Sequence, residues 1–516
     1  MRLINFFDRA VALYPRNTFL SQGATQRTYF DAQEATHRIA AALRSEALRP
    51  GDPVGFYMPN DWRGIEALYG AFRAGLPVAP VNARNSVAQN AAFLRASGAR
   101  ALFFHSHYAA DAAEVMRTCP QIRVSVCLDV PANGCPELSQ WMAPPGTHVE
   151  DIAILPSDAW AIFGTSGTTG EPKCVVQTHL TALAMTWDML FAMQVQSPVR
   201  HLVAAPVSHF AGSFLFALSS IGSTHVIHES VDVLNILQTI EAEKIEILFL
   251  PPTVIYMMLA HDDVRRFDYS SLKALVYAGA PMARAKVREA IGVFGPVMMN
   301  MFGQTEANGP IAFLRPEEHR LDAGPEWDWR LQSIGRASIT RQIGIMSDEG
   351  QLLGARETGE VVVRGWGNCA GYLNNPAASE ELMRHGWLHT GDIGVKDEEG
   401  YVVLLDRKKD MIVTGGLNVF SAEVEQVLMS HPAVLAAVVI GVPDAKWGEA
   451  VKAVVELKPN ETVTEEALIH LCKDELGSVK APKSVEFRAE LPRTPTGKIL
   501  KREIRKPYWL DQERSI

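Results

Sequence analysis

The 516-residue chain predicts an α/β fold with a large N-terminal domain and a small C-terminal domain. Short apolar runs of strand length alternate with helical patterns over roughly the first 400 residues, which favours sheets covered by helices. From about residue 350 the strand signals become denser and indicate a β-rich subdomain. A chain of this length also exceeds one ordinary hydrophobic core, so at least two domains are expected.

The large domain begins with alternating strands and helices. Residues 54–58, 101–104, 245–250 and 272–279 read as buried strands, and a helix is predicted through 67–72. Ligands of open α/β sheets bind at the carboxyl ends of the strands. The turn Gly279-Ala280-Pro281 follows the last of these strands, so we expect it at the binding edge of the sheet.

The pattern changes toward the C-terminus. Residues 359–364 and 400–405 predict the β-rich subdomain, and the charged segment DRKKD follows at 406–410. After it come helical patterns near 421–430 and 464–476 and strand patterns at 435–440 and 451–457, which together predict a small α+β domain. We place the boundary at the charged segment, which gives domains of residues 1–406 and 407–516.

Composition limits the classes of function. The chain is 47% hydrophobic and 21% charged with a net charge of −9, which disfavours nucleic acid as the main partner. Six cysteines without a CxxC pair indicate neither a zinc site nor a disulfide framework, and favour a reducing, cytoplasmic setting. The N-terminus has no signal-peptide pattern, and the apolar stretch 210–221 falls short of the ~20 residues that span a bilayer. We therefore expect no stable membrane insertion, and a homodimer is left open.

A glycine- and hydroxyl-rich loop, FGTSGTTGEPK, occupies residues 163–173. Glycines let backbone N–H groups turn toward an anion, and hydroxyls and a lysine add donors and charge. It is not a Walker loop, because Glu171 and Pro172 separate the last glycine from the lysine. An ordinary solvated turn is the plainer alternative. The predicted polyphosphate contacts are Thr165, Ser166, Gly167, Thr168, Thr169, Gly170 and Lys173.

Four further motifs follow in order: PVSHFAG at 206–212, NMFGQTE at 300–306, TGD at 390–392 with Asp406-Arg407 soon after, and PRTPTGK at 492–498. Together with the loop they resemble the ANL superfamily of adenylate-forming enzymes, over nearly the whole chain. The GG pair at 415–416 is similar to that of bacterial fatty-acyl and aryl-CoA ligases. The resemblance implies a mobile C-terminal domain, and it implies ATP, Mg²⁺ and coenzyme A as ligands.

The resemblance also implies roles for single residues. Lys498 is the expected catalytic cation between the substrate carboxylate and the α-phosphate, and Glu306, together with Thr165, is the expected Mg²⁺ ligand. Asp392 would bind the ribose hydroxyls with help from Arg407. His209 would stand between the nucleotide and the acyl pocket, although a hydrogen-bonded core histidine is the plainer reading. Further nucleotide contacts are expected at Gly279, Ala280, Pro281, Asn300, Met301, Phe302, Gly303, Gln304 and Thr305.

The acid to be activated is only partly defined. Residues 206–218 contain no carboxylate, so the ammonium of an α-amino acid would lie unpaired at a high cost. Matching positions to the family gives an apolar pocket that suits a medium-chain fatty or an aryl carboxylate, between which the sequence does not choose. Core packing explains the phenylalanines equally well. The predicted pocket residues are Phe210, Ser213, Phe214, Ala307 and Gly309.

The resulting hypothesis is an ATP-dependent acyl-CoA ligase with two half-reactions. Acyl-AMP and pyrophosphate form first, and coenzyme A then takes the acyl group as a thioester. Between the steps the small domain is expected to rotate about Lys409, which brings Gly415 and Gly416 to the site. One departure from the family is Cys174, because a glycine usually follows the loop lysine. The alternatives are transfer to a carrier protein or another acceptor, and a catalytically inactive nucleotide-binding protein that acts through interactions.

Overall fold

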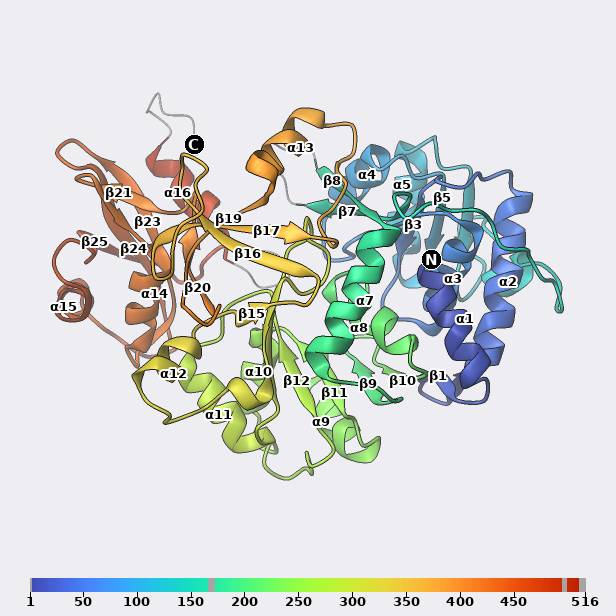
Figure 1. Ribbon diagram of the computed structural model, residues 1–516, viewed down its shortest axis with the longest axis horizontal. Helices are drawn as coiled ribbons and strands as arrows, with labels where there is room; N and C mark the ends of the chain where they lie inside the picture. Colours follow the sequence, from blue (N-terminus) through green and yellow to red (C-terminus); the bar gives the residue numbers. More distant parts are fainter. Residues whose placement is uncertain (1, 166–171, 494–498, 510–516) are drawn as a thin grey trace. The chain divides into compact units, whose positions relative to one another are not determined.

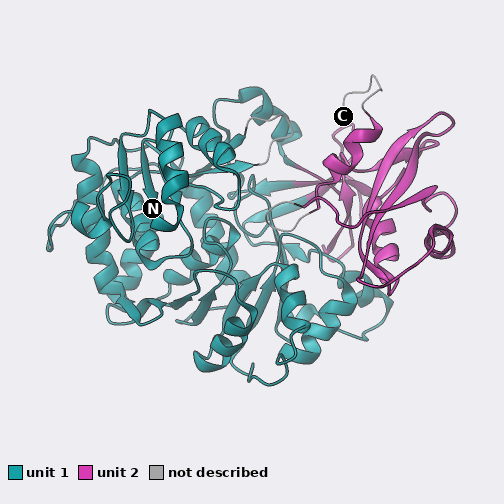
Figure 2. Ribbon diagram, turned by 180° about the vertical axis from the view of Figure 1, so that it is seen from behind, with its two compact units in different colours: residues 1–343, 363–389 teal, residues 344–362, 390–516 magenta. Residues whose placement is uncertain are grey.

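The computed structural model describes residues 2–165, 172–493 and 499–509. The chain divides into two compact units, a large unit of residues 1–343 and 363–389 and a small unit of residues 344–362 and 390–516 (Figure 2). The expected boundary at residues 406–407 lies inside the small unit and stays a prediction. Within the described residues, no helix combines the length and the apolar character that crossing a bilayer requires. All six cysteines are free thiols.

A nine-stranded sheet of described strands forms one part of the large unit, in the order β15-β14-β13-β12-β11-β9-β10-β1-β2 (Figure 1). Its strands from β13 through β1 pair in parallel, and antiparallel strands close both edges. The predicted strands at 245–250 and 272–279 are β11 and β12. The bounds are β1 Thr18–Gln22, β2 Thr25–Thr28, β9 Arg200–Val203, β10 Thr224–Ile227, β11 Ile247–Leu250, β12 Ala274–Tyr277, β13 Met298–Phe302, β14 Ala312–Leu314 and β15 Arg336–Ala337.

A seven-stranded sheet, again counted over described strands, has the order β18-β8-β7-β4-β3-β5-β6. The neighbours among β7, β4, β3, β5 and β6 pair in parallel, whereas β8 runs antiparallel to both β7 and β18. The predicted strands at 54–58 and 101–104 are β3 and β5. The bounds are β3 Val54–Tyr57, β4 Val78–Pro80, β5 Ala101–Phe104, β6 Val124–Cys127, β7 Ala159–Thr165, β8 Lys173–Thr178 and β18 Gly371–Tyr372.

Helices cover these sheets and enclose the largest core. The predicted helix at 67–72 is part of α3, which begins where the Asp61 carboxylate accepts the N–H groups of Arg63 and Gly64 and ends at Gly75 with φ of 77°. The helices of the large unit are α1 Leu3–Leu13, α2 Tyr29–Ser45, α3 Trp62–Ala74, α4 Val87–Ala96, α5 Ala109–Thr118, α6 Leu138–Trp141, α7 His179–Met193, α8 Phe210–Ser219, α9 Val233–Ala242, α10 Pro252–Leu259, α11 Arg284–Phe294, α12 Pro325–Arg330 and α13 Pro376–Leu382.

The small unit has the α+β character that the sequence predicts. Most residues of the four-stranded sheet β16-β17-β19-β20 belong to this unit, and a further sheet has the order β22-β21-β24-β23 with β25 beside β24. Buried valines such as Val439 and Val451 pack under α14 and α15. The bounds are β16 Arg341–Met346, β17 Thr358–Gly365, β19 Leu388–Lys396, β20 Val402–Arg407, β21 Ile412–Thr414, β22 Leu417–Val419, α14 Ser421–Ser430, β23 Val434–Asp444, β24 Gly448–Leu457, α15 Glu465–Leu476, β25 Ser484–Phe487 and α16 Lys501–Arg505.

Candidate active site

The glycine-rich loop joins the ends of β7 and β8. These strands are antiparallel, and Thr165 at the end of β7 pairs with Lys173 at the start of β8. The Thr165 hydroxyl lies 3.5 Å from the carbonyl oxygen of Lys173. Both ends of the loop are therefore held at one sheet edge. The predicted contacts Ser166, Gly167, Thr168, Thr169 and Gly170 lie outside the described residues.

Tyr372 connects two of the predicted site residues. Its hydroxyl donates to Glu306 Oε1 at 2.9 Å, and the Lys173 ammonium lies 4.9 Å from the centroid of its ring. The backbone fixes this arrangement, because β18 pairs with β8 and the Cys369 N–H donates to the Glu306 carbonyl oxygen at 2.8 Å. Burial and the neighbouring Glu306 carboxylate raise the pKa of Tyr372, so its hydroxyl remains a donor.

The carboxyl ends of β12 and β13 contribute the next segments. These neighbours are parallel, with Tyr277 opposite Asn300, so the residues that follow them share one edge of the sheet. Gly279, Ala280 and Pro281 follow β12 and are exposed, and their role as nucleotide contacts stays a prediction. The segment after β13 is fastened to the other sheet, since Gln177 on β8 donates to the Thr305 carbonyl oxygen at 2.5 Å. The remaining predicted contacts of β13 and its loop are Asn300, which donates to the Ser333 carbonyl oxygen, buried Met301, half-buried Phe302 and Gln304, and exposed Gly303.

A buried ion pair lies behind Glu306. Arg341 Nε donates to Asp188 on α7 at 2.9 Å, and neither side chain is accessible to solvent. The Arg341 Nη2 group also donates to the carbonyl oxygen of Asn308, two residues after Glu306. Gly367 lacks the Cβ that would overlap this guanidinium, at 1.7 Å from Nη2. Arg341 therefore joins α7, the loop after Glu306 and the segment that precedes Tyr372.

Sequence reasoning missed the residues that hold the site together. None of the motifs considered above contains Tyr372, Gln177 or Arg341. Each of these residues contacts a partner that lies far away in the sequence. Asp188 gives the clearest signal, because it is the one carboxylate in the otherwise uncharged pattern of 179–193. A single acid in an apolar helix needs a buried partner.

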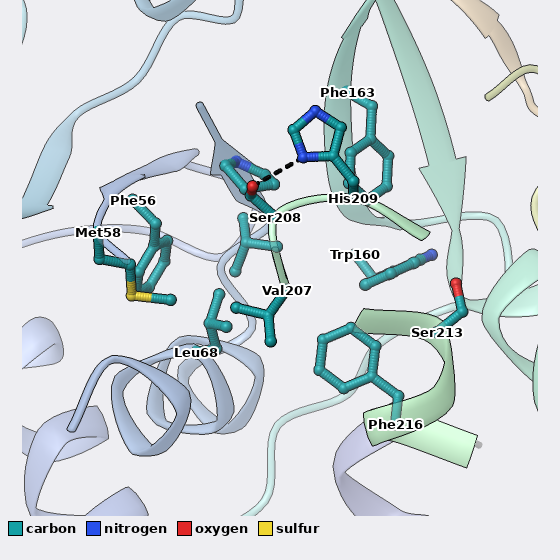
Figure 3. Close-up of a pocket in the computed structure, with 12 residues that line it drawn as sticks. Phe56, Met58, Leu68, Trp160, Phe163, Val207, Ser208, His209, Ser213 and Phe216 are labelled. Atoms are coloured by element: carbon teal, nitrogen blue, oxygen red, sulfur yellow. Dashed lines mark hydrogen bonds between the residues drawn. The ribbon is translucent and has the colours of Figure 1, made fainter. Parts of the chain in front are cut away.

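His209 stands at the mouth of an apolar hollow (Figure 3). Its Nδ1 lies 2.8 Å from the hydroxyl oxygen of Ser208, and the residue is exposed. Desolvation by the surrounding chain lowers the pKa of His209, and Arg84 lowers it further. Gly212 allows this turn, because a Cβ there would lie 2.4 Å from the Val207 carbonyl oxygen. The walls of the hollow include Phe56, Met58, Trp160, Phe163, Ser213 and Phe216.

The predicted acyl-pocket residues separate into groups. Ser213 lines the hollow behind His209. Phe210 and Phe214 contact Phe249 instead, with ring centroids 5.3 and 5.4 Å apart. Ala307 and Gly309 are buried in the loop after Glu306. The role of these residues as acyl contacts stays a prediction.

In the small unit Asp392 and Arg407 form an ion pair. They lie opposite each other on the antiparallel strands β19 and β20, and Arg407 Nε is 2.6 Å from Asp392 Oδ1. The Asp392 side chain is almost fully buried, whereas Arg407 is partly exposed. Two residues of neighbouring strands thus place a carboxylate and a guanidinium side by side.

Gly415 and Gly416 form the tight turn between β21 and β22. Their φ values of 58° and 78° fall in the left-handed region that favours glycine. The Gly415 N–H donates to the Trp447 carbonyl oxygen at 2.8 Å. Lys409 is exposed, and its carbonyl oxygen accepts from Arg505. Lys498 lies outside the described residues.

The expected metal site offers oxygen ligands. Glu306 provides a half-buried carboxylate and Thr165 a half-buried hydroxyl, both hard donors of the kind that Mg²⁺ accepts. Among the described residues no cluster of three or more histidine, cysteine or acidic side chains could hold a metal. One protein carboxylate suits Mg²⁺, which commonly takes its other ligands from substrate phosphates and water. The donor set therefore fits the ion.

Comparison with known proteins gives the family of the chain. The AMP-binding enzyme family matches residues 7–373, and the AMP-binding enzyme C-terminal domain matches residues 423–498. The chain therefore belongs to the AMP-binding enzymes, and the resemblance to the adenylate-forming superfamily is confirmed.

Several of its relatives match it over nearly its whole length, and most of them are named as acyl- or aryl-CoA ligases. A feruloyl-CoA synthase from Amycolatopsis sp is 33% identical over 505 residues, covering 97% of this chain and 98% of that protein. The structure of the amide bond synthetase McbA from Marinactinospora thermotolerans has a TM-score of 0.90 at 29% identity and covers 98% of this chain and 99% of that one. An o-succinylbenzoate CoA synthetase from Bacillus subtilis, bound to its acyl-adenylate intermediate, has a TM-score of 0.85 at 26% identity, covering 99% and 98%. The predicted fold class is confirmed, and the roles of single residues stay predictions.

Proposed function

We propose that the protein is an ATP-dependent carboxylic acid–CoA ligase that works through an acyl-adenylate. The observation that carries the proposal is the cluster of Lys173, Tyr372 and Glu306, which gathers a cation, a hydroxyl donor and a carboxylate at the end of the glycine-rich loop. Membership of the AMP-binding enzymes and full-length relatives such as the feruloyl-CoA synthase support it. The six free cysteines support a cytoplasmic location.

In the first half-reaction an oxygen of the substrate carboxylate attacks the α-phosphorus of ATP. A bond forms between them, the bond to the bridging oxygen breaks, and pyrophosphate leaves. Two anions must approach, and a unit charge pair at about 4 Å is worth roughly 4 kcal/mol at an effective dielectric near 20. Since about 1.4 kcal/mol changes a rate tenfold, one placed cation matters greatly. Lys498 is the proposed cation, while Lys173 holds the polyphosphate.

Glu306 and Thr165 are the proposed Mg²⁺ ligands. Bound Mg²⁺ would supply positive charge against the phosphate oxygens. Tyr372 orients the Glu306 carboxylate by its hydrogen bond and leaves the second oxygen for the metal. Tyr372 is thus a positioning residue.

Asp392 is the proposed ribose ligand, because a carboxylate can accept hydrogen bonds from both hydroxyls. Its ion pair with Arg407 orients it. In the second half-reaction the sulfur of coenzyme A attacks the acyl carbon and AMP leaves. Rotation about Lys409 and an approach of the Gly415-Gly416 turn are proposed for this step.

The hollow behind His209 supports an acid with an apolar body. The described residues of its walls include no acidic or basic side chain apart from His209, and aromatic and aliphatic groups dominate them (Figure 3). Burial of apolar surface there favours binding by about 25 cal/mol per Å². A medium-chain fatty or an aryl carboxylate fits this lining.

An acceptor other than coenzyme A is the second candidate, because the amide bond synthetase shares the fold over nearly the whole chain. Pyrophosphate release with a panel of fatty and aryl acids separates the two. We expect release with at least one such acid and a thioester only when coenzyme A is added. Product formed with an amine or a carrier protein instead would favour the second candidate, and no release with any acid would refute both.

Lys498→Ala tests the proposed cation. This variant should lose adenylate formation and still convert supplied acyl-AMP to thioester, because the lysine acts only in the first step. Labelled pyrophosphate exchange measures the first half-reaction, and thioester formation from acyl-AMP measures the second. An unchanged overall rate would remove Lys498 from the mechanism.

A further inference from the structure

One face of α7 is apolar and left partly exposed by the described residues. The helix contains no lysine, arginine or glutamate, and its one aspartate is buried against Arg341. Its outward residues recur at intervals of three and four, the spacing of a helix–helix seam. Leu180, Trp187 and Phe191 leave 39%, 47% and 45% of their surface exposed. The exposed part of the seam consists of Leu180, Leu183 and Trp187, with Phe191 beside it, and Leu190 continues the spacing but packs against the core.

The apolar surface continues beyond the helix. Trp366 is 56% exposed and lies 6.1 Å from Trp187 between ring centroids. At the N-terminal end of α7 a groove is lined by Leu155, Leu180 and Trp366, and Leu155 is 64% exposed. We call the set Leu155, Leu180, Leu183, Trp187, Phe191 and Trp366 the α7 patch. It belongs entirely to the large unit, and α7 runs across the view in Figure 1.

We propose that the α7 patch is the contact surface between two copies of this chain, which pair through antiparallel α7 helices. A two-fold axis across the helix makes every contact occur twice. The groove lies at one end of α7 and Phe191 at the other, so each copy offers an aromatic side chain to the groove of its partner. With 15 residues, α7 is ~22 Å long, enough for about four seam positions. This inference is independent of the proposed reaction.

The area of the patch suits a reversible dimer. Large side chains bury roughly 150–250 Å² each, so half-exposed ones leave about 100 Å² apiece. The patch then offers roughly 600 Å² per copy and ~1,200 Å² in a symmetric pair, the lower end for a specific interface. Two isolated tryptophans would need no explanation, but a continuous apolar surface of this size does.

The charges around the patch favour a second copy over a membrane. Surfaces that bind anionic lipid carry lysine and arginine beside the apolar face. Here the charged residues that contact the patch or its ends have both signs: Arg315 lies over the Phe191 ring at 4.9 Å, Glu317 accepts from Gln194 at 3.2 Å, and Asp158 accepts from the Leu155 N–H at 2.8 Å. The chain as a whole has a net charge of −9. An uncharged seam with charges of both signs at its rim suits a second copy better than an anionic lipid surface.

Sedimentation velocity of the full-length protein across the micromolar range tests the proposal. We expect a concentration-dependent species of twice the 56.7 kDa monomer mass. Trp187→Glu and, separately, Leu155→Glu should shift dissociation at least tenfold toward monomer. Leu155 lies outside any helix, so its variant remains informative if the helical one folds poorly. Phe30→Glu is the matched control, because Phe30 is 60% exposed on α2 and lies outside the patch.

Two further results decide the matter. Circular dichroism and pyrophosphate exchange of the folded variants should equal those of the parent protein, since the patch contains none of the proposed site residues. A parent protein that stays monomeric, or a dimer that survives both patch substitutions, would overturn the proposal. Co-sedimentation of the parent protein with vesicles of phosphatidylcholine and phosphatidylglycerol, lost in Trp187→Glu, would also overturn it in favour of a lipid surface.

Discussion

The candidate residues of the large unit and of the small unit are held in different ways. In the large unit Lys173, Glu306 and Tyr372 come from three distant segments and meet through side-chain and cross-sheet contacts. In the small unit Asp392 and Arg407 are opposite each other on neighbouring strands, and the Gly415-Gly416 turn is a local hairpin. The first arrangement depends on long-range packing, and the second on local backbone geometry. A substitution far from the chemistry should therefore disturb the large unit more.

Removal of the buried acid gives the largest expected effect. Asp188→Ala leaves the Arg341 guanidinium buried without its carboxylate, which should cost about 3–5 kcal/mol in the free energy of unfolding. Urea denaturation measures it. Asp263→Ala removes the partly exposed partner of the exposed Arg266 and should cost less than about 1 kcal/mol. Equal effects of both substitutions would contradict the structural role of the buried pair.

Tyr372→Phe comes next and tests the link between the loop and Glu306. A hydrogen bond to a charged group is worth about 1.5–3 kcal/mol, so pyrophosphate exchange should fall roughly 10- to 100-fold. The Mg²⁺ concentration for half-maximal exchange should rise as well, which a purely structural role would not cause. Tyr508→Phe is the control, because Tyr508 likewise donates to a glutamate, Glu486, but in the small unit. An unchanged Mg²⁺ dependence would argue against orientation of Glu306 by Tyr372.

Acid should weaken the large unit more than the small one. Burial lowers the pKa of His201 to about 3 and that of His225 well below 6.5, and their Nδ1 atoms lie 3.0 Å apart. In the unfolded chain these histidines take up a proton near pH 6.5. Their contribution to the free energy of unfolding is therefore fully present above that pH and is lost as the pH decreases toward 3. The shifted pKa of His201 alone should lower the free energy of unfolding by ~2 kcal/mol at pH 5. Hydrogen exchange at pH 7 and pH 5 should show a greater loss of protection in β9 and β10 than in β23 and β24. Equal losses would contradict this difference.

The turn of the small unit gives the smallest expected effect. Gly415→Ala places a Cβ 2.7 Å from the Trp447 ring and also strains a left-handed residue. Gly416→Ala adds only the strain, about 1–2 kcal/mol, since nothing lies within 4 Å of its Cβ. In thermal denaturation, the Gly415→Ala variant should therefore have a lower melting temperature than the Gly416→Ala variant. The reverse order would show that Trp447 yields easily.

The sequence is informative about elements and single residues but not about their connections. Continuous apolar runs predict β3, β5, β11 and β12, because strands buried on both faces need such runs. Helix α14 is predicted at its observed bounds. The contacts of Tyr372 with Lys173 and Glu306 span up to about 200 residues and depend on strand pairing. No local pattern encodes them, so the assembly of the site becomes visible only in the folded chain.

Trp447 has a consequence for experiments in solution. It is partly exposed, packs against the Gly415 turn and lies under the Lys446 ammonium at 4.6 Å. The small unit contains only Trp447 and Trp509 of the ten tryptophans in the chain. Replacement of Trp509 by phenylalanine would leave one indole there, and the difference in emission and iodide quenching between this variant and one that also lacks Trp447 would report what approaches this turn.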